Sequence, residues 1–177
     1  YATADGTAIA GTQYVSKSGT LTFAAGDSSK TISVTTTANA GEICASDKNF
    51  TVQLSNAAQA GIGTSSATGT ITDPDIPSVS LADTSGTEGN NIVFTASLSA
   101  ACSTKNVSFN WATSSGTAIS NTDFGAVNSA ASVTAGTTTV TLPVTTIQNS
   151  IYEGDKNFTV SLSSFTNATA GSPTSAT

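Results

Sequence analysis

Asp47-Lys48-Asn49-Phe50-Thr51-Val52 decides the fold, because the same six residues recur at Asp155–Val160. Upstream, Gly6-Thr7-Ala8-Ile9 recurs as Gly116-Thr117-Ala118-Ile119, and the two matches are offset by 108 and 110 residues. A period of about 110 residues is the length of a whole domain and is too long for the short units of a solenoid. The sequence therefore predicts two tandem domains that share one fold.

The composition excludes several classes of function. The 177-residue chain has a net charge of −6 and contains no His. A negative chain is a poor partner for nucleic acid or an anionic membrane surface, and no apolar stretch reaches the ~18 residues that span a bilayer. Without His, a Ser-His-Asp triad and most zinc sites are impossible. The chain also has no Met, so we expect it to be part of a longer protein.

Apolar and polar residues alternate in short runs, as in Val107, Phe109 and Trp111, and Gly, Asn, Asp and Ser separate the runs. This spacing is typical of strands with one buried face. About seven short strands per ~100 residues indicate an immunoglobulin-like sandwich. Asp73-Pro74-Asp75-Ile76-Pro77 contains two prolines, which would interrupt a strand ladder. We therefore predict an all-β chain with domains at 1–75 and 76–177.

The two copies are incomplete in different ways. Tyr1-Ala2-Thr3 matches Trp111-Ala112-Thr113, so the first copy lacks counterparts of Val79–Asn110. The second copy stops at Ser175-Ala176-Thr177, which matches Ser66-Ala67-Thr68, and so it lacks most of its last strand. Either the chain is cut from a longer array, or strands of a neighbouring molecule complete the first domain by β-strand addition. The second alternative predicts a filament of identical subunits.

Several ordered blocks resemble the Calx-beta domain family. In the first copy these are Tyr1–Ala8, Ser18–Phe23 and Lys30–Val34, and the second copy adds Tyr152–Asp155 and Asn157–Val160. The resemblance implies two tandem seven-stranded sandwiches. It also implies one of two roles, because such domains occur as calcium sensors in sodium/calcium exchangers and as repeats in long extracellular adhesion proteins. The Thr/Ser/Ala-rich composition is most similar to the bacterial array type.

The resemblance implies calcium ligands in the second copy at Glu88, Asp123 and Glu153. Calcium prefers six to eight oxygen ligands with several carboxylates among them. Gln148 and Asn149 stand where the family has an Asp pair, and they offer carbonyl oxygen without charge. The alternative is that the three carboxylates are turn residues that cap backbone amides.

The first copy offers fewer ligands. Gln13 stands in place of Asp123 and Ala45 in place of Glu153, and the longer loop at Ala38–Glu42 supplies only Glu42. The linker residues Asp73 and Asp75 remain as further carboxylates. Because calcium affinity falls with carboxylate number, we expect at most a weak site, in domain two.

The two cysteines are Cys44 and Cys102. In a Calx-beta sandwich Cys44 would lie in a loop of domain one that faces domain two, and Cys102 in a loop of domain two that faces domain one. We therefore predict a disulfide between them. The alternatives are a pair of free buried thiols in an intracellular protein, or two cysteines that each pair with a residue outside this sequence.

Three functions remain open, and none makes this chain itself an enzyme. The leading interpretation is a structural or adhesive repeat of an extracellular or cell-surface protein, a stalk, adhesin or filament whose partners are neighbouring copies. The second is a calcium-regulated binding module. The third is an accessory domain that positions a catalytic domain elsewhere in a parent protein.

Overall fold

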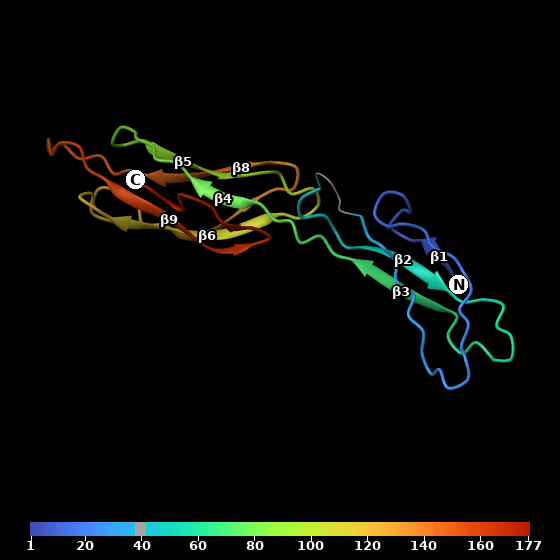
Figure 1. Cartoon of the computed structure of the whole chain (residues 1–177). Coiled ribbons are helices and arrows are strands. Elements are labelled where there is room, and N and C mark those ends of the chain that lie inside the picture. The colour runs from blue at the N-terminus through green and yellow to red at the C-terminus, as the bar shows by residue number, and fades with distance from the viewer. Residues whose placement is uncertain (38–41) are drawn as a thin grey trace. The chain divides into compact units, whose positions relative to one another are not determined.

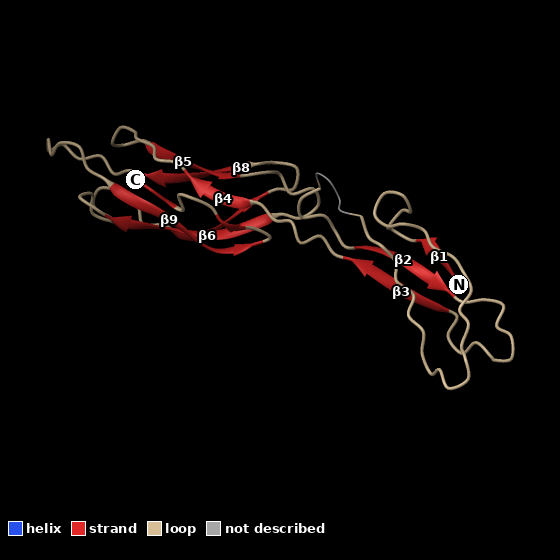
Figure 2. Cartoon of the chain, viewed as in Figure 1, coloured by secondary structure: helices blue, strands red, loops and turns tan. Residues whose placement is uncertain are grey.

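The computed structural model describes residues 1–37 and 42–177, and those residues form strands and loops without a helix (Figure 2). Most of the longer loop expected at Ala38–Glu42 lies outside the described residues. The chain divides into two compact units (Figure 1). Unit 1 is drawn from Tyr1–Gly41 and Ser46–Asp73, and unit 2 comprises Glu42–Ala45 and Pro74–Thr177. The short segment Glu42–Ala45 therefore comes from the first repeat and folds with the second unit.

Unit 2 is a sandwich of two four-stranded sheets. One sheet has the order β10 (Thr169–Ala170), β4 (Ser78–Leu81), β5 (Asn91–Leu98) and β8 (Thr139–Thr145). The other has the order β11 (Ser175–Ala176), β9 (Phe158–Thr166), β6 (Val107–Ser115) and β7 (Asn128–Val133). All neighbours are antiparallel except β10 and β4, which are parallel. The predicted all-β, immunoglobulin-like fold is confirmed.

The core of unit 2 lies between its two sheets and follows the predicted alternation. Phe94, Ala96 and Leu98 of β5 are buried, as are Phe158 and Val160 of β9. The residues between them along each strand are more exposed, because successive side chains of a strand point to opposite faces. Each strand thus contributes one apolar face to a single core.

Unit 1 has a smaller sheet with the order β1 (Ala2–Asp5), β2 (Lys48–Gln53) and β3 (Ser66–Ile71), all antiparallel. Its buried hydrophobic cluster consists of Ala8, Tyr14 and Phe50. The rings of Tyr14 and Phe50 are stacked with centroids 4.6 Å apart. Phe124 and Phe158 occupy the equivalent repeat positions of unit 2 and are stacked in the same way, at 4.4 Å.

Two blocks of the first copy, Ser18–Phe23 and Lys30–Val34, form no strand in unit 1. The counterpart of the second block is β8, whose partner in unit 2 is β5. Residues 1–73 hold no counterpart of β5. Backbone groups of the second block therefore lack the partner strand that the equivalent segment of unit 2 has. The expectation that the first sandwich lacks its early strands agrees with this smaller sheet.

Candidate functional site

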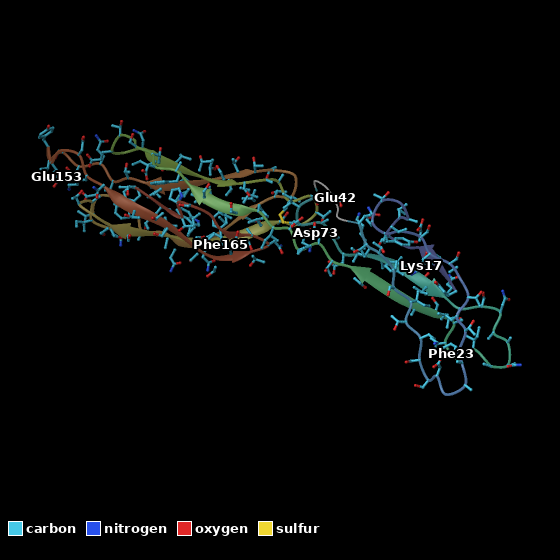
Figure 3. All side chains as sticks on the ribbon, in the orientation of Figure 1. Lys17, Phe23, Glu42, Asp73, Glu153 and Phe165 are labelled. Carbon is cyan, nitrogen blue, oxygen red and sulfur yellow. A yellow bond between two sulfur atoms is a disulfide. The ribbon has the colours of Figure 1, made fainter. Side chains whose placement is uncertain are left out.

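The three predicted carboxylates line one surface cavity of about 880 Å³ in unit 2. Glu88 precedes β5, Asp123 follows β6, and Glu153 lies in the loop between β8 and β9. Rings of the core, including Phe124 and Phe158, also line the cavity. Glu153 and the disulfide lie at opposite ends of unit 2 (Figure 3).

Asp123 is held in place by the turn in which it lies. Its Oδ2 accepts a hydrogen bond of 2.7 Å from the Ile119 backbone N–H, and its own N–H donates to the Ile119 carbonyl at 2.8 Å. The next residue, Phe124, is 1% exposed and anchors the turn to the core. Asp123 thus caps a backbone amide, as the alternative interpretation of this carboxylate predicted.

The ammonium group of Lys156 lies between Asp123 and Glu153. Its Nζ donates to Asp123 Oδ1 at 3.0 Å and to Glu153 Oε2. The hydrogen bond from Ile119, and then Lys156, hold the pKa of Asp123 below its ordinary value. Lys156, and then Asn149, lower the pKa of Glu153. The two carboxylates in turn raise the pKa of Lys156, Glu153 more than Asp123, so all three groups are charged at neutral pH.

Asn149 joins the remaining carboxylate to the same network. Its backbone N–H donates to Glu88 Oε1 at 2.9 Å, and its side-chain Nδ2 lies 3.4 Å from Glu153 Oε2. Its Oδ1 accepts from the Ile151 N–H at 2.7 Å. This side-chain carbonyl oxygen, which could have been a cation ligand, is therefore used to shape the loop itself.

As arranged, these residues do not fit a calcium ion. Within residues 1–37 and 42–177, no three acidic, His or Cys side chains come close enough together to hold a metal. Asp123 and Glu153 share an internal cation instead, and Glu88 accepts from a backbone amide. A calcium ion would have to displace the Lys156 ammonium to gain both carboxylates.

The first repeat shows whether the turn that contains Asp123 needs a charged side chain or only a hydrogen-bond acceptor. Gln13, the counterpart of Asp123, uses its Oε1 to accept a hydrogen bond of 2.8 Å from the Ile9 backbone N–H. Ile9 and Ile119 are also counterparts. The uncharged amide therefore performs the same capping as the carboxylate, which shows that this turn needs an acceptor and does not need a charge.

The predicted disulfide between Cys44 and Cys102 is present, with the two Cα atoms 4.9 Å apart (Figure 3). Both cysteines are buried. The carbonyl oxygen of Ile43 accepts from the Ser103 N–H at 2.7 Å, and the Thr104 hydroxyl donates to the Cys44 carbonyl at 3.0 Å. These contacts belong to unit 2, which contains the segment Glu42–Ala45.

The linker carboxylates do not add to the acidic cavity. Asp73 is the last residue of unit 1. The backbone carbonyl of Asp75 accepts from the Cys44 N–H at 2.8 Å, so Asp75 lies beside the disulfide. Neither residue lines the cavity that holds Glu88, Asp123 and Glu153.

Lys156 was missed as a member of the cavity network, whereas Asn149 was expected there as a source of carbonyl oxygen. One sequence signal pointed to the lysine, because the recurring Asp-Lys-Asn-Phe-Thr-Val block places it three residues after Glu153. Residues three apart can pair when the local backbone bends them to one side. Asn149 was marked by its place in the family pattern, but its role as a donor to Glu88 and Glu153 depends on the path of the loop between β8 and β9.

The sequence model of the Calx-beta domain matches residues 1–75 and 78–177. A solved structure of the apo form of the Calx CBD1 domain has 18% identity and a TM-score of 0.52, and covers 58% of this chain and 95% of that one. CBD12 of CALX1.2 has 19% identity and a TM-score of 0.43, and covers 94% of this chain and 67% of that one. The calcium binding domain CBD12 of CALX1.1 has 18% identity and a TM-score of 0.43, and covers 94% of this chain and 66% of that one. No curated protein sequence matches the chain.

Proposed function

Because the chain belongs to the Calx-beta domain family, we propose that its two domains are structural repeat units of an extracellular or cell-surface protein. The parent protein in this proposal is a stalk, an adhesin or a filament. The partners of each domain are neighbouring domains of the same kind, in the same chain or in another copy.

The observation that carries this proposal is the disulfide between the two repeats. Cys44 belongs to the first repeat by sequence and is bonded to Cys102 of the second. Disulfides form and persist in oxidising compartments, which favours a location outside the cell. Among the residues that the structure describes there is no helix that could span a membrane. A covalent connection between successive repeats suits a protein that bears tension.

A calcium-binding regulatory module is the alternative function. It is favoured by Glu88, Asp123 and Glu153, which line one cavity. The position of Lys156 argues against it, because the ammonium group already neutralises part of the acidic charge. In our proposal this end of unit 2 is stable without calcium.

Thermal unfolding with and without calcium separates the two functions. The 177-residue chain should have the same Tm in EDTA and in about 1 mM CaCl2, a concentration at which weak extracellular calcium modules are occupied. A ligand that binds only the folded state would raise the Tm. Asp123→Ala is the control. A calcium-dependent rise in the wild type that is lost in Asp123→Ala would establish the alternative and contradict the structural proposal.

A further inference from the structure

The disulfide closes a large covalent loop. Its two cysteines are 58 residues apart in the sequence. The loop contains β2 and β3 of unit 1 and β4 and β5 of unit 2. β1 precedes the loop, and every strand from β6 onward follows it.

The path of the chain makes this loop unusual for a tandem repeat. Residues 42–45 lie in unit 2, residues 46–73 return to unit 1, and the chain enters unit 2 again at Pro74. Two simple tandem domains are joined by one linker, and here the chain passes between the units three times. The first passage brings Cys44 into unit 2, where the disulfide joins it to Cys102.

We propose that the Cys44–Cys102 bond is a load bypass. When the chain is pulled from its two ends, tension passes from residue 44 to residue 102 through the sulfur atoms. Residues 45–101, including the linker with its two prolines, then carry no tension. This inference rests on the proposed structural function, because a bypass has a use only in a protein that is stretched.

The bypass also changes where the load enters unit 2. Without the bond, tension would enter through the linker at β4, a strand of four residues with three paired residues on β5 and two on β10. With the bond, tension enters at Cys102, just before β6. That strand has nine residues and lies between β9 and β7 in the centre of its sheet. The load is therefore moved from a short strand to a long central one.

The bonded segment is built into the unit that receives the load. Cys44 and Cys102 are members of the buried cluster of unit 2, and Ile43 packs against it. The Ser103 hydroxyl adds a hydrogen bond of 3.0 Å to the Ile43 carbonyl. The backbone carbonyl of Cys102 itself accepts a hydrogen bond of 2.8 Å from the Gly136 N–H. Core packing and hydrogen bonds within unit 2 thus hold Cys102, the residue at which the tension enters.

The bypass has a measurable length. At about 3.5 Å for each extended residue, the 58 backbone steps between the cysteines would span roughly 200 Å when fully stretched. The disulfide replaces that span with a Cα–Cα distance of 4.9 Å. A fully unfolded, bonded chain should therefore be roughly 200 Å shorter than an unbonded one.

Single-molecule force spectroscopy on the full chain tests the proposal, with the chain held through terminal peptide tags that contain no cysteine. The wild type should reach its shorter full length, and addition of a reductant to the stretched chain should release the remaining roughly 200 Å. The double variant Cys44→Ser, Cys102→Ser should show the longer length from the start and unfold unit 2 at lower force. The reductant step keeps the test valid if that variant does not fold.

Equal full lengths before and after reduction would overturn the load bypass. That result would mean that the bond is absent, so it would also remove the main support for the structural function. Equal unfolding forces with the bond intact would instead count against the bypass alone. Equal unfolding forces for unit 2 in the wild type and a folded double variant would overturn the claim that load is moved to β6, even if the lengths differ as expected.

Discussion

Replacement of Phe158 by Ala should remove a large part of the stability of unit 2. The Phe158 side chain is 7% exposed. Its ring is stacked on that of Phe124 with centroids 4.4 Å apart and meets the ring of Phe94 edge to face at 5.8 Å. Buried Phe→Ala changes cost about 3–5 kcal/mol through lost burial and the cavity left behind. We expect a loss of about 4 kcal/mol, since both neighbouring rings lose a partner.

Urea denaturation followed by Trp111 fluorescence measures this loss in unit 2 alone. Trp111 is the single Trp of the chain, lies in β6, and is 7% exposed, so its emission should change when unit 2 unfolds. With a dependence of about 2 kcal/mol per molar urea for a small domain, the midpoint should fall by roughly 2 M.

Phe50→Ala is the matched control, because Phe50 occupies the same repeat position in unit 1 and is 6% exposed there. Its ring stacks on Tyr14, and both belong to the separate core of unit 1. This variant should destabilise unit 1 and leave the Trp111 transition unchanged. Equal shifts of that transition in both variants would refute the assignment of two separate cores. A loss below about 1 kcal/mol for Phe158→Ala would refute the magnitude worked out from the burial and ring contacts of Phe158.

Three further predictions concern single contacts. Asp123→Asn should lower the urea midpoint of unit 2 at neutral pH. The difference from the wild type should close as the pH falls through the folded-state pKa of Asp123, which lies below 3.8. A carboxylate whose pKa is lowered by folding stabilises the folded state only while it is ionised. A difference in midpoint that persists at lower pH would contradict this explanation. Gly116→Ala should lower the free energy of unfolding by roughly 1–3 kcal/mol in the same assay, because the added Cβ would lie 2.7 Å from the Asn157 backbone carbonyl oxygen. An unchanged midpoint would show that the backbone moves to make room for the Cβ. Cys44→Ser with Cys102→Ser should lower the midpoint by an amount equivalent to about 4 kcal/mol, the chain-entropy value for a loop of this length, and a non-reducing peptide map of the wild type should show the two cysteines in one linked fragment.

Much of the fold could be predicted because the chain repeats itself and alternates strictly. The period showed two domains, and runs such as Val107, Phe109 and Trp111 showed which face of a strand is buried. The segments at Ser18–Phe23 and Lys30–Val34 were harder, because a strand needs a partner as well as a pattern. The placement of Glu42–Ala45 in unit 2 could not be predicted, since it depends on contacts with Ser103 and Thr104.

The candidate site was predicted in part. Family motifs pointed to Glu88, Asp123 and Glu153, and the structure brings all three to one cavity. Sequence spacing alone could not distinguish carboxylates that converge on a metal from carboxylates that hold an ammonium group. That distinction depends on where the loop between β8 and β9 directs Lys156 and Asn149. The disulfide was predicted because the resemblance puts each cysteine in a loop at the junction between the two copies, although the family pattern did not show that the Cys44 segment folds with unit 2.

A crystal structure of the 177-residue chain grown with calcium, at or above about 1 mM, would show whether unit 2 keeps its ion pairs or takes up a metal in their place. We expect that Lys156 Nζ remains bonded to Asp123 and Glu153, that Glu88 still accepts from the Asn149 N–H, and that no metal lies among the three carboxylates. A calcium ion coordinated by Asp123 and Glu153, with the Lys156 side chain turned out into solvent, would contradict this expectation.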